Sequence, residues 1–270
     1  MYLTRIICLL ALAGIFMIPA EKTYSTVRSG EILQNDFHWQ GVVATGRALE
    51  INAIYGNIHA EATSSSEAEV IATRHSQVSD PNEVQIQQVQ HSGGITICAV
   101  YPSDDPKQPN ECQPGDGKSH VHNNDVRVDF TVKVPPGVRL IARTINGDIV
   151  ASSLGGNVEA YSSLGNIRIS TTGYAQAKSV SGSITATMGN ADWSGQIEFE
   201  TVTGEIAIRL PAKSNTELHA ETVTGIISTE FPLTVQGSSG HRDMNGVIGD
   251  GGRKLTLKTI SGAIKLLRET

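Results

Sequence analysis

The sequence predicts an all-β protein whose chain forms a single-stranded β-solenoid, a β-helix-like stack of two-strand repeats of ~18–22 residues. Three observations support this fold class. A six-residue pattern recurs: Thr or Ser, an aliphatic residue, a small polar residue, Gly, any residue and Ile. The glycines of successive copies are spaced by about one repeat. The residues after each glycine alternate between apolar and polar, which is typical of strands with one buried face.

The first expected element is a secretory signal. A single basic residue, Arg5, precedes an uncharged run from Ile6 to Ile18, and this run is shorter than the roughly 20 residues that a membrane-spanning helix needs. We predict a signal peptide over residues 1–20, with cleavage as late as residue 25. The competing interpretation is an uncleaved anchor, which would be the chain's only contact with a membrane. Export implies the periplasm, the cell surface or the extracellular space.

The second expected element is an N-terminal β region over residues 26–135, continuous with the repeats that follow. Residues 94–98 and 125–134 alternate as strands, and Pro135-Pro136-Gly137 ends the second strand. Between them, residues 98–125 form a polar, proline-rich insertion. In an oxidising compartment Cys98 and Cys112 should form a disulfide that closes this insertion and stabilises the fold by roughly 3 kcal/mol. The alternative is two unrelated thiols.

The third expected element is the regular solenoid over residues 136–270. Full copies of the pattern begin at Thr144, Ser179, Thr201, Thr222 and Thr259, and a weaker copy begins at Ser162. Their glycines, which we expect at sharp turns that require a positive φ, are Gly147, Gly165, Gly182, Gly204, Gly225 and Gly262. Because a two-strand unit can also form a hairpin, an antiparallel sandwich is the alternative fold.

Two faces are expected on each strand of the repeats. Ile197 and Phe199 share one face, and Glu198 and Glu200 share the other. Such strands bury an aliphatic ladder that no single repeat could bury alone. Basic residues gather in the last copy, where we expect them to protect the exposed end of the stack. They are Arg253, Lys254, Lys258, Lys265 and Arg268.

The residues around the repeats carry a family resemblance. The segment Val134-Pro135-Pro136-Gly137-Val138 and the repeats after it resemble the adhesin-type domain family DUF4097, as do residues 191–193, 231–233 and 249–255. The resemblance covers roughly residues 40–270. It implies a β-solenoid on a bacterial envelope protein, and it carries over no catalytic residue and no agreed ligand. One departure is Ile226, which follows Gly225 where other copies place a polar residue.

Two groups of side chains could form a metal site or a glycan-cleaving site. His120 and His122, with Asp125, could hold a divalent cation, although an exposed polar loop explains them more simply, and no cofactor is expected. Glu198, Glu200 and Glu205 could serve a glycan-cleaving enzyme, which needs two carboxyl groups, but a solvated face also explains them. A net charge of −6 excludes nucleic acid as a natural partner.

We therefore expect a non-enzymatic, exported cell-envelope protein that presents a long β surface for structural or adhesive contacts. Envelope glycans or surface proteins are its expected partners. The alternatives are a glycan-acting β-helix enzyme and a sensing or scaffold protein of the envelope-stress response.

Overall fold

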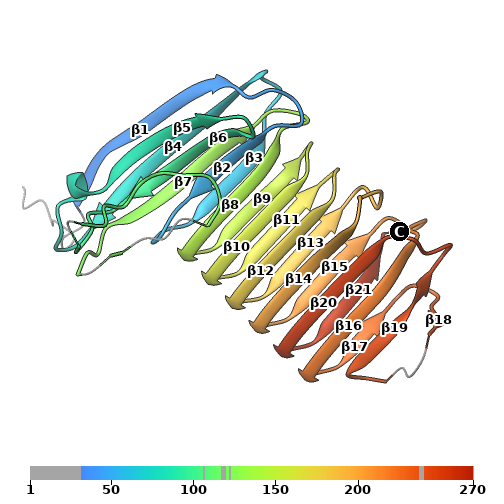
Figure 1. The fold of residues 1–270 in the computed structure, drawn as a ribbon. Coiled ribbons are helices and arrows are strands. Elements are labelled where there is room, and N and C mark those ends of the chain that lie inside the picture. Colours follow the sequence, from blue (N-terminus) through green and yellow to red (C-terminus); the bar gives the residue numbers. More distant parts are fainter. Residues whose placement is uncertain (1–31, 106, 117–119, 122, 237–239, 270) are drawn as a thin grey trace, which may run out of the picture. The chain divides into compact units, whose positions relative to one another are not determined.

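Two long β-sheets face each other in the computed structural model of this protein, and nearly all other residues connect them (Figure 1). The structure describes residues 32–269 except 106, 117–119, 122 and 237–239. The predicted signal segment therefore lies outside the described residues. Among the residues that are described, no helix has the length and apolar character needed to cross a membrane.

Sheet A consists of ten strands. In spatial order they are β1 (Ile32–Val42), β4 (Glu67–Ser76), β7 (Arg127–Val134), β3 (Ile58–Ala62), β9 (Ile149–Leu154), β11 (Ile167–Thr171), β13 (Ile184–Met188), β15 (Ile206–Leu210), β21 (Ile264–Arg268) and β17 (Ile227–Thr229). The pairs β1–β4 and β4–β7 are antiparallel, and the strands from β7 to β17 pair in parallel.

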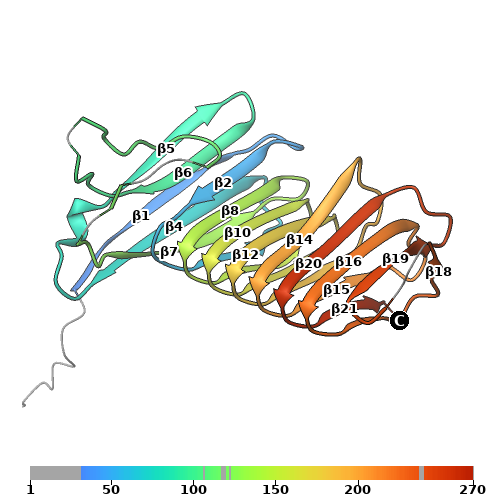
Figure 2. The same cartoon turned by 60° about the horizontal axis from the view of Figure 1, so that its bottom comes forward.

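Sheet B consists of eleven strands. In spatial order they are β18 (Thr234–Val235), β19 (Asp243–Ile248), β16 (Thr216–Thr224), β20 (Lys254–Ser261), β14 (Gln196–Thr203), β12 (Ala175–Ser181), β10 (Val158–Leu164), β8 (Arg139–Asn146), β2 (Ala48–Asn52), β6 (Gly94–Val100) and β5 (Gln85–His91). The strands from β16 to β6 pair in parallel, and Figure 2 shows them side by side. A short 3₁₀ helix, η1 (Pro81–Glu83), precedes β5.

The core between the sheets is the predicted aliphatic ladder. The isoleucine that ends each motif lies in register with its neighbours and is buried: Ile58, Ile149, Ile167, Ile184, Ile206, Ile264 and Ile227. Ile197 and Phe199 are likewise buried. The β-solenoid fold class that the sequence predicts is therefore confirmed, and the antiparallel sandwich is wrong.

Each motif contributes a second ladder through its first residue. The Thr or Ser hydroxyl is buried and donates to the carbonyl oxygen of a motif glycine in the neighbouring coil. Thr144 bonds to Gly56 in this way at 3.0 Å, and Thr201 bonds to Gly182 at 2.9 Å. Equivalent hydrogen bonds are donated by the hydroxyl groups of Ser162, Ser179, Thr222 and Thr259. These hydrogen bonds explain why the motif begins with a hydroxyl residue.

The motif glycines are required by close contact between coils. A Cβ atom built on Gly147 would lie 1.9 Å from the carbonyl oxygen of Gly56, and one on Gly182 would lie 1.9 Å from that of Gly165. Gly165, Gly182, Gly204 and Gly262 have the positive φ that the sequence predicts, between 154° and 158°, whereas Gly147 and Gly225 do not have a positive φ in this range. At all six positions an added Cβ would lie within 2.2 Å of a carbonyl oxygen of the neighbouring coil. Stacking distance therefore excludes a side chain at every motif glycine, including the two without a positive φ.

The order of the last coils differs from the order of the sequence. β20 lies between β14 and β16, and β21 lies between β15 and β17. The antiparallel pair β18–β19 precedes them along the chain and covers the outer side of β16. The basic residues of the final repeat therefore lie inside the stack, so their expected place at its exposed end is wrong. Arg253 contacts Asp192, and Lys265 contacts Glu205 at 2.8 Å.

Candidate binding groove

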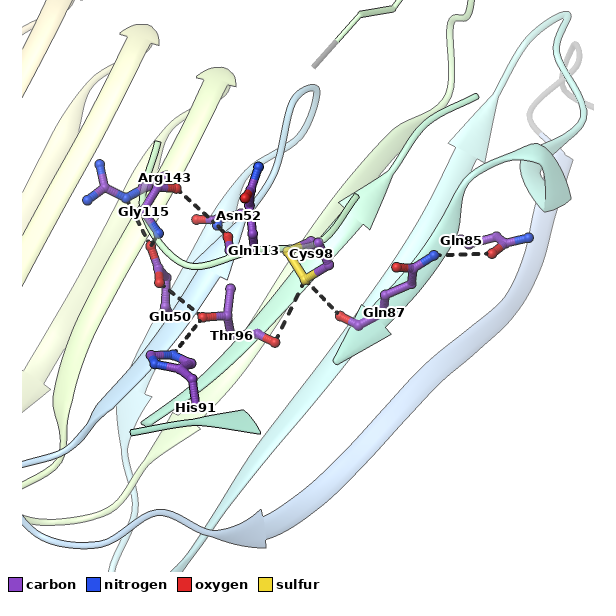
Figure 3. The surroundings of a disulfide bond; sticks show 11 residues. Glu50, Asn52, Gln85, Gln87, His91, Thr96, Cys98, Gln113, Gly115 and Arg143 are labelled. Carbon is purple, nitrogen blue, oxygen red and sulfur yellow. Dashed lines mark hydrogen bonds and ion pairs between the residues drawn. A yellow bond between two sulfur atoms is a disulfide. The ribbon is translucent and has the colours of Figure 1, made fainter. Parts of the chain in front are cut away.

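The insertion folds back onto the outer face of sheet B. A disulfide joins Cys98, in β6, to Cys112, with 5.5 Å between the Cα atoms (Figure 3). The side chain of Asn110 braces the insertion, because its Nδ2 donates to the carbonyl oxygens of Tyr101 and His120 at 3.0 and 2.8 Å. This bracing and the disulfide hold residues 110–116 beside the strands of sheet B.

A buried carboxylate anchors the end of the insertion. Glu50, in β2, is 3% exposed. Its Oε1 accepts hydrogen bonds from Arg143 Nε at 3.1 Å and from the backbone N–H of Gly115 at 3.0 Å. Its Oε2 accepts one from Thr96 Oγ1 at 3.0 Å. Figure 3 shows these groups converging. Removing Glu50 would therefore leave Arg143 with Asp116 as its carboxylate partner and would remove one anchor of the insertion, and a buried cation is costly when its pairing is lost.

Arg143 joins the insertion to the repeats. Its guanidinium also contacts Asp116, and its Cζ atom lies 4.1 Å from the centre of the Tyr161 ring in the next strand, β10. Burial raises the pKa of Tyr161, so this ring stays neutral at physiological pH. A cation held over an aromatic face in this way fixes the orientation of both side chains.

A groove of about 430 Å³ lies between the insertion and strands β8 to β14. Its wall includes Glu111 and Asp116 from the insertion. Its floor continues from Arg143 to Lys178, whose Nζ lies 2.6 Å from Glu198 and 3.0 Å from Glu200. The hydrogen bond with Glu198 is the main reason that the pKa of Lys178 is raised, so this cation persists.

An aliphatic row runs beside these charged residues. It is formed by the second residue of each full motif, which points outward and is 40–53% exposed. The row is interrupted at β10, where the weaker copy has Ser163. Its members are Ile145, Val180, Val202, Ile260 and Val223, in the order of their strands. The first three also line the groove. The groove floor thus combines an apolar row with a polar and charged row.

The predicted glycan-site carboxylates do not form one set. Glu198 and Glu200 share Lys178, whereas Glu205 contacts Lys265, at the corner that leads into sheet A. The residues that build the groove, Glu50 and Arg143, were not singled out in the sequence. Glu50 and Arg143 lie 93 residues apart in the sequence. The signal that could have indicated Glu50 is an acidic residue within an apolar strand, and Arg143 has no comparable signal.

The predicted metal ligands that the structure describes do not form a metal site, and Asp125 instead binds backbone N–H groups. Asp125 accepts hydrogen bonds from three consecutive backbone N–H groups, those of Gln77, Val78 and Ser79. The bonds with Ser79 are the largest cause of the strong lowering of the Asp125 pKa. His122 lies outside the described residues. In the described part of the chain, no three His, Cys, Asp or Glu side chains come close enough to hold a metal ion.

Known proteins include distant matches to this chain. No curated protein matches the sequence significantly. The solved structures that match at a TM-score under 0.5 include a candidate cell adhesion protein from Clostridium sporogenes (13% identity, 87% of this chain and 100% of that chain, TM-score 0.47) and a candidate adhesin from Bacteroides fragilis (14%, 86% and 97%, TM-score 0.23). A candidate lipid-binding protein from Parabacteroides distasonis is 9% identical (86% and 96%, TM-score 0.26).

The family comparison is more decisive. The model of the Toastrack DUF4097 family matches residues 26–267, which is nearly the whole chain. The resemblance that the motif residues carry and the stacked sheets of the structure point to the same family. This chain belongs to the Toastrack DUF4097 family.

Proposed function

We propose that this protein is an exported, non-enzymatic component of the cell envelope that makes adhesive contacts through the outer face of sheet B. The observation that carries the proposal is the aliphatic row. Five outward-facing aliphatic side chains line up along sheet B, four of them on the consecutive strands β12, β14, β20 and β16, with Ser163 of β10 between these and Ile145 of β8. Isolated exposed apolar residues are what an ordinary protein surface shows.

The groove supports the same proposal. A disulfide-anchored wall beside an apolar and charged floor is the arrangement of a preformed binding site. The disulfide also supports export, because such bonds persist mainly in oxidising compartments.

Three measurements test the proposal. Fractionation of the native organism should place the protein outside the cytoplasm, and the intact mass of the exported form should include a Cys98–Cys112 disulfide. Purified residues 26–270 should bind to cells or to an array of envelope glycans and surface proteins, and Val180→Ser/Val202→Ser should weaken this binding. Recovery of the protein in the cytoplasm, or equal binding by the variant, would reject the proposal.

The enzymatic alternative is tested in the same assay. Lys178 lies between Glu198 and Glu200, so the charge of each carboxylate is offset by the same ammonium group. We therefore expect bound glycans to remain intact. Release of new reducing ends from the array, lost in Glu198→Gln/Glu200→Gln, would support a glycan-acting enzyme instead.

A further inference from the structure

We infer that the groove binds a cationic, amphipathic polypeptide segment. This inference rests on the proposed contact function and specifies the chemistry of one partner. It starts from the charges that surround the groove. Arg143 is paired with two carboxylates, Glu50 and Asp116. Lys178 is paired with two more, so neither cation is left to attract an anionic ligand.

The charge balance of the groove is therefore negative. Three carboxylates, those of Glu111, Asp116 and Glu200, line the groove together with the two cations, which gives a formal net charge of −1. Lys258 lies beside Glu200 in the neighbouring strand β20 and does not line the groove. Glu111 is exposed, and the side chain of Asp116 at the rim is 89% exposed. These two groups are open to a cationic partner.

The aliphatic row adds the second requirement. Ile145, Val180 and Val202 lie on β8, β12 and β14, which are up to three strand spacings apart in sheet B. With about 4.8 Å between strands, these side chains span about 14 Å, and the row continues to Val223 for about 24 Å in total. About seven residues of extended polypeptide cover that distance. A partner that combines positive charge with apolar side chains over this length matches both rows.

Polypeptide fits these rows better than glycan does. Sugar sites commonly offer an open aromatic face, but the ring of Tyr161, the aromatic side chain that lines the groove, is covered by Arg143. An anionic polymer would meet the carboxylates of the wall. A neutral glycan would leave the charge excess without a partner.

A labelled-peptide experiment tests the inference. The probe is a fluorescein-labelled dodecapeptide that alternates lysine and leucine, and its binding to residues 26–270 is followed by fluorescence anisotropy. Two matched peptides replace either every lysine by glutamate or every leucine by serine. We expect the lysine–leucine peptide to bind at least tenfold more tightly than either control peptide. Equal binding of the glutamate–leucine peptide, or tighter binding of a neutral oligosaccharide, would overturn the inference.

Matched protein variants locate the site. Glu111→Gln/Asp116→Asn should weaken binding of the lysine–leucine peptide about three- to tenfold, as expected for two exposed charge pairs. Asp104→Asn/Asp250→Asn removes the same charge at exposed positions outside the groove and should change the affinity less than twofold. Melting curves should show that both variants are folded. If both variants weaken binding equally, the attraction is a property of the whole acidic protein and the inference is wrong.

The outcome also separates this inference from the proposed function. Adhesion that persists in Glu111→Gln/Asp116→Asn, with no binding of the lysine–leucine peptide to any form of the protein, would remove the inference and leave the proposed function. Binding of the lysine–leucine peptide without adhesion to cells or to the array would keep the inference and reject the proposed function.

Discussion

The contact between coils at the motif glycines can be measured by substituting alanine at two contrasting positions. At Gly147 the backbone is not left-handed, but an added Cβ would lie 1.9 Å from the carbonyl oxygen of Gly56. At Gly195 φ is +76° and a Cβ would meet nothing within 4 Å. The first substitution therefore isolates close packing, and the second isolates backbone strain.

The expected cost at Gly147 is larger. The two coils must separate by about 1 Å to relieve the contact, which weakens the hydrogen bonds from Thr144 to Gly56 and from Ile58 to Asp148. Two such bonds contribute about 1–3 kcal/mol in total, and overpacking costs a further 1–3 kcal/mol. We expect Gly147→Ala to lower the free energy of unfolding by about 4 kcal/mol. Gly195→Ala should lower it by about 1–2 kcal/mol, the cost of a left-handed non-glycine residue.

Urea denaturation followed by far-UV circular dichroism measures the difference. Stacked repeats can depart from two-state unfolding. The unfolding curves of the two variants are therefore fitted with one shared m-value, the slope of the unfolding free energy against urea concentration. A cost at Gly147 equal to or below that at Gly195 would refute close packing between coils as a reason for the motif glycines.

Three further predictions concern other contacts. Thr201→Val keeps the shape of the side chain but removes the ladder hydrogen bond, so the free energy of unfolding should fall by about 1 kcal/mol; no change in the urea midpoint would contradict the ladder. Asp125→Asn should lower the melting temperature at pH 7. Because hydrogen bonds, chiefly with Ser79, hold the folded pKa of Asp125 below its unfolded value, the stabilisation is present above pH ~4 and is lost in more acidic solution. The wild type and this variant should therefore converge as the pH falls, and a constant difference in melting temperature would be inconsistent with this. Cys112→Ser should lower the free energy of unfolding by about 3 kcal/mol and should speed hydrogen exchange in residues 110–116; the same effect should follow when the wild type is reduced, and unchanged exchange would show that the disulfide does not hold the wall.

Local patterns in the sequence predicted the coils well. Alternation places Ile197 and Phe199 inward because strand geometry leaves no other option once one face is buried. The motif glycines were also found, and the predicted positive φ is present at four of the six. A second requirement arises between coils, as the contact of Gly147 with Gly56 shows, and a single repeat contains no information about the distance to its neighbour.

The groove could not be predicted in the same way. It depends on Glu50 and Arg143, which belong to different parts of the chain and meet only because β2 and β8 are adjacent in sheet B. Its wall is an irregular insertion, for which no periodicity exists to read. The paired cysteines gave the one usable signal, since they tie that insertion to β6.

The final coil is inserted between two earlier coils, with β20 between β14 and β16. The motifs that begin at Thr222 and Thr259 are nearly identical, so both could stack on the coil of β14 through the same glycine and hydroxyl contacts. Charge distinguishes them. Lys258, in β20, lies in register between Glu200 on β14 and Glu221 on β16. Stacking in the order of the sequence would place these two carboxylates directly opposite each other, and like charges in that position are destabilising. Lys258 therefore favours the observed order of the coils over the order of the sequence.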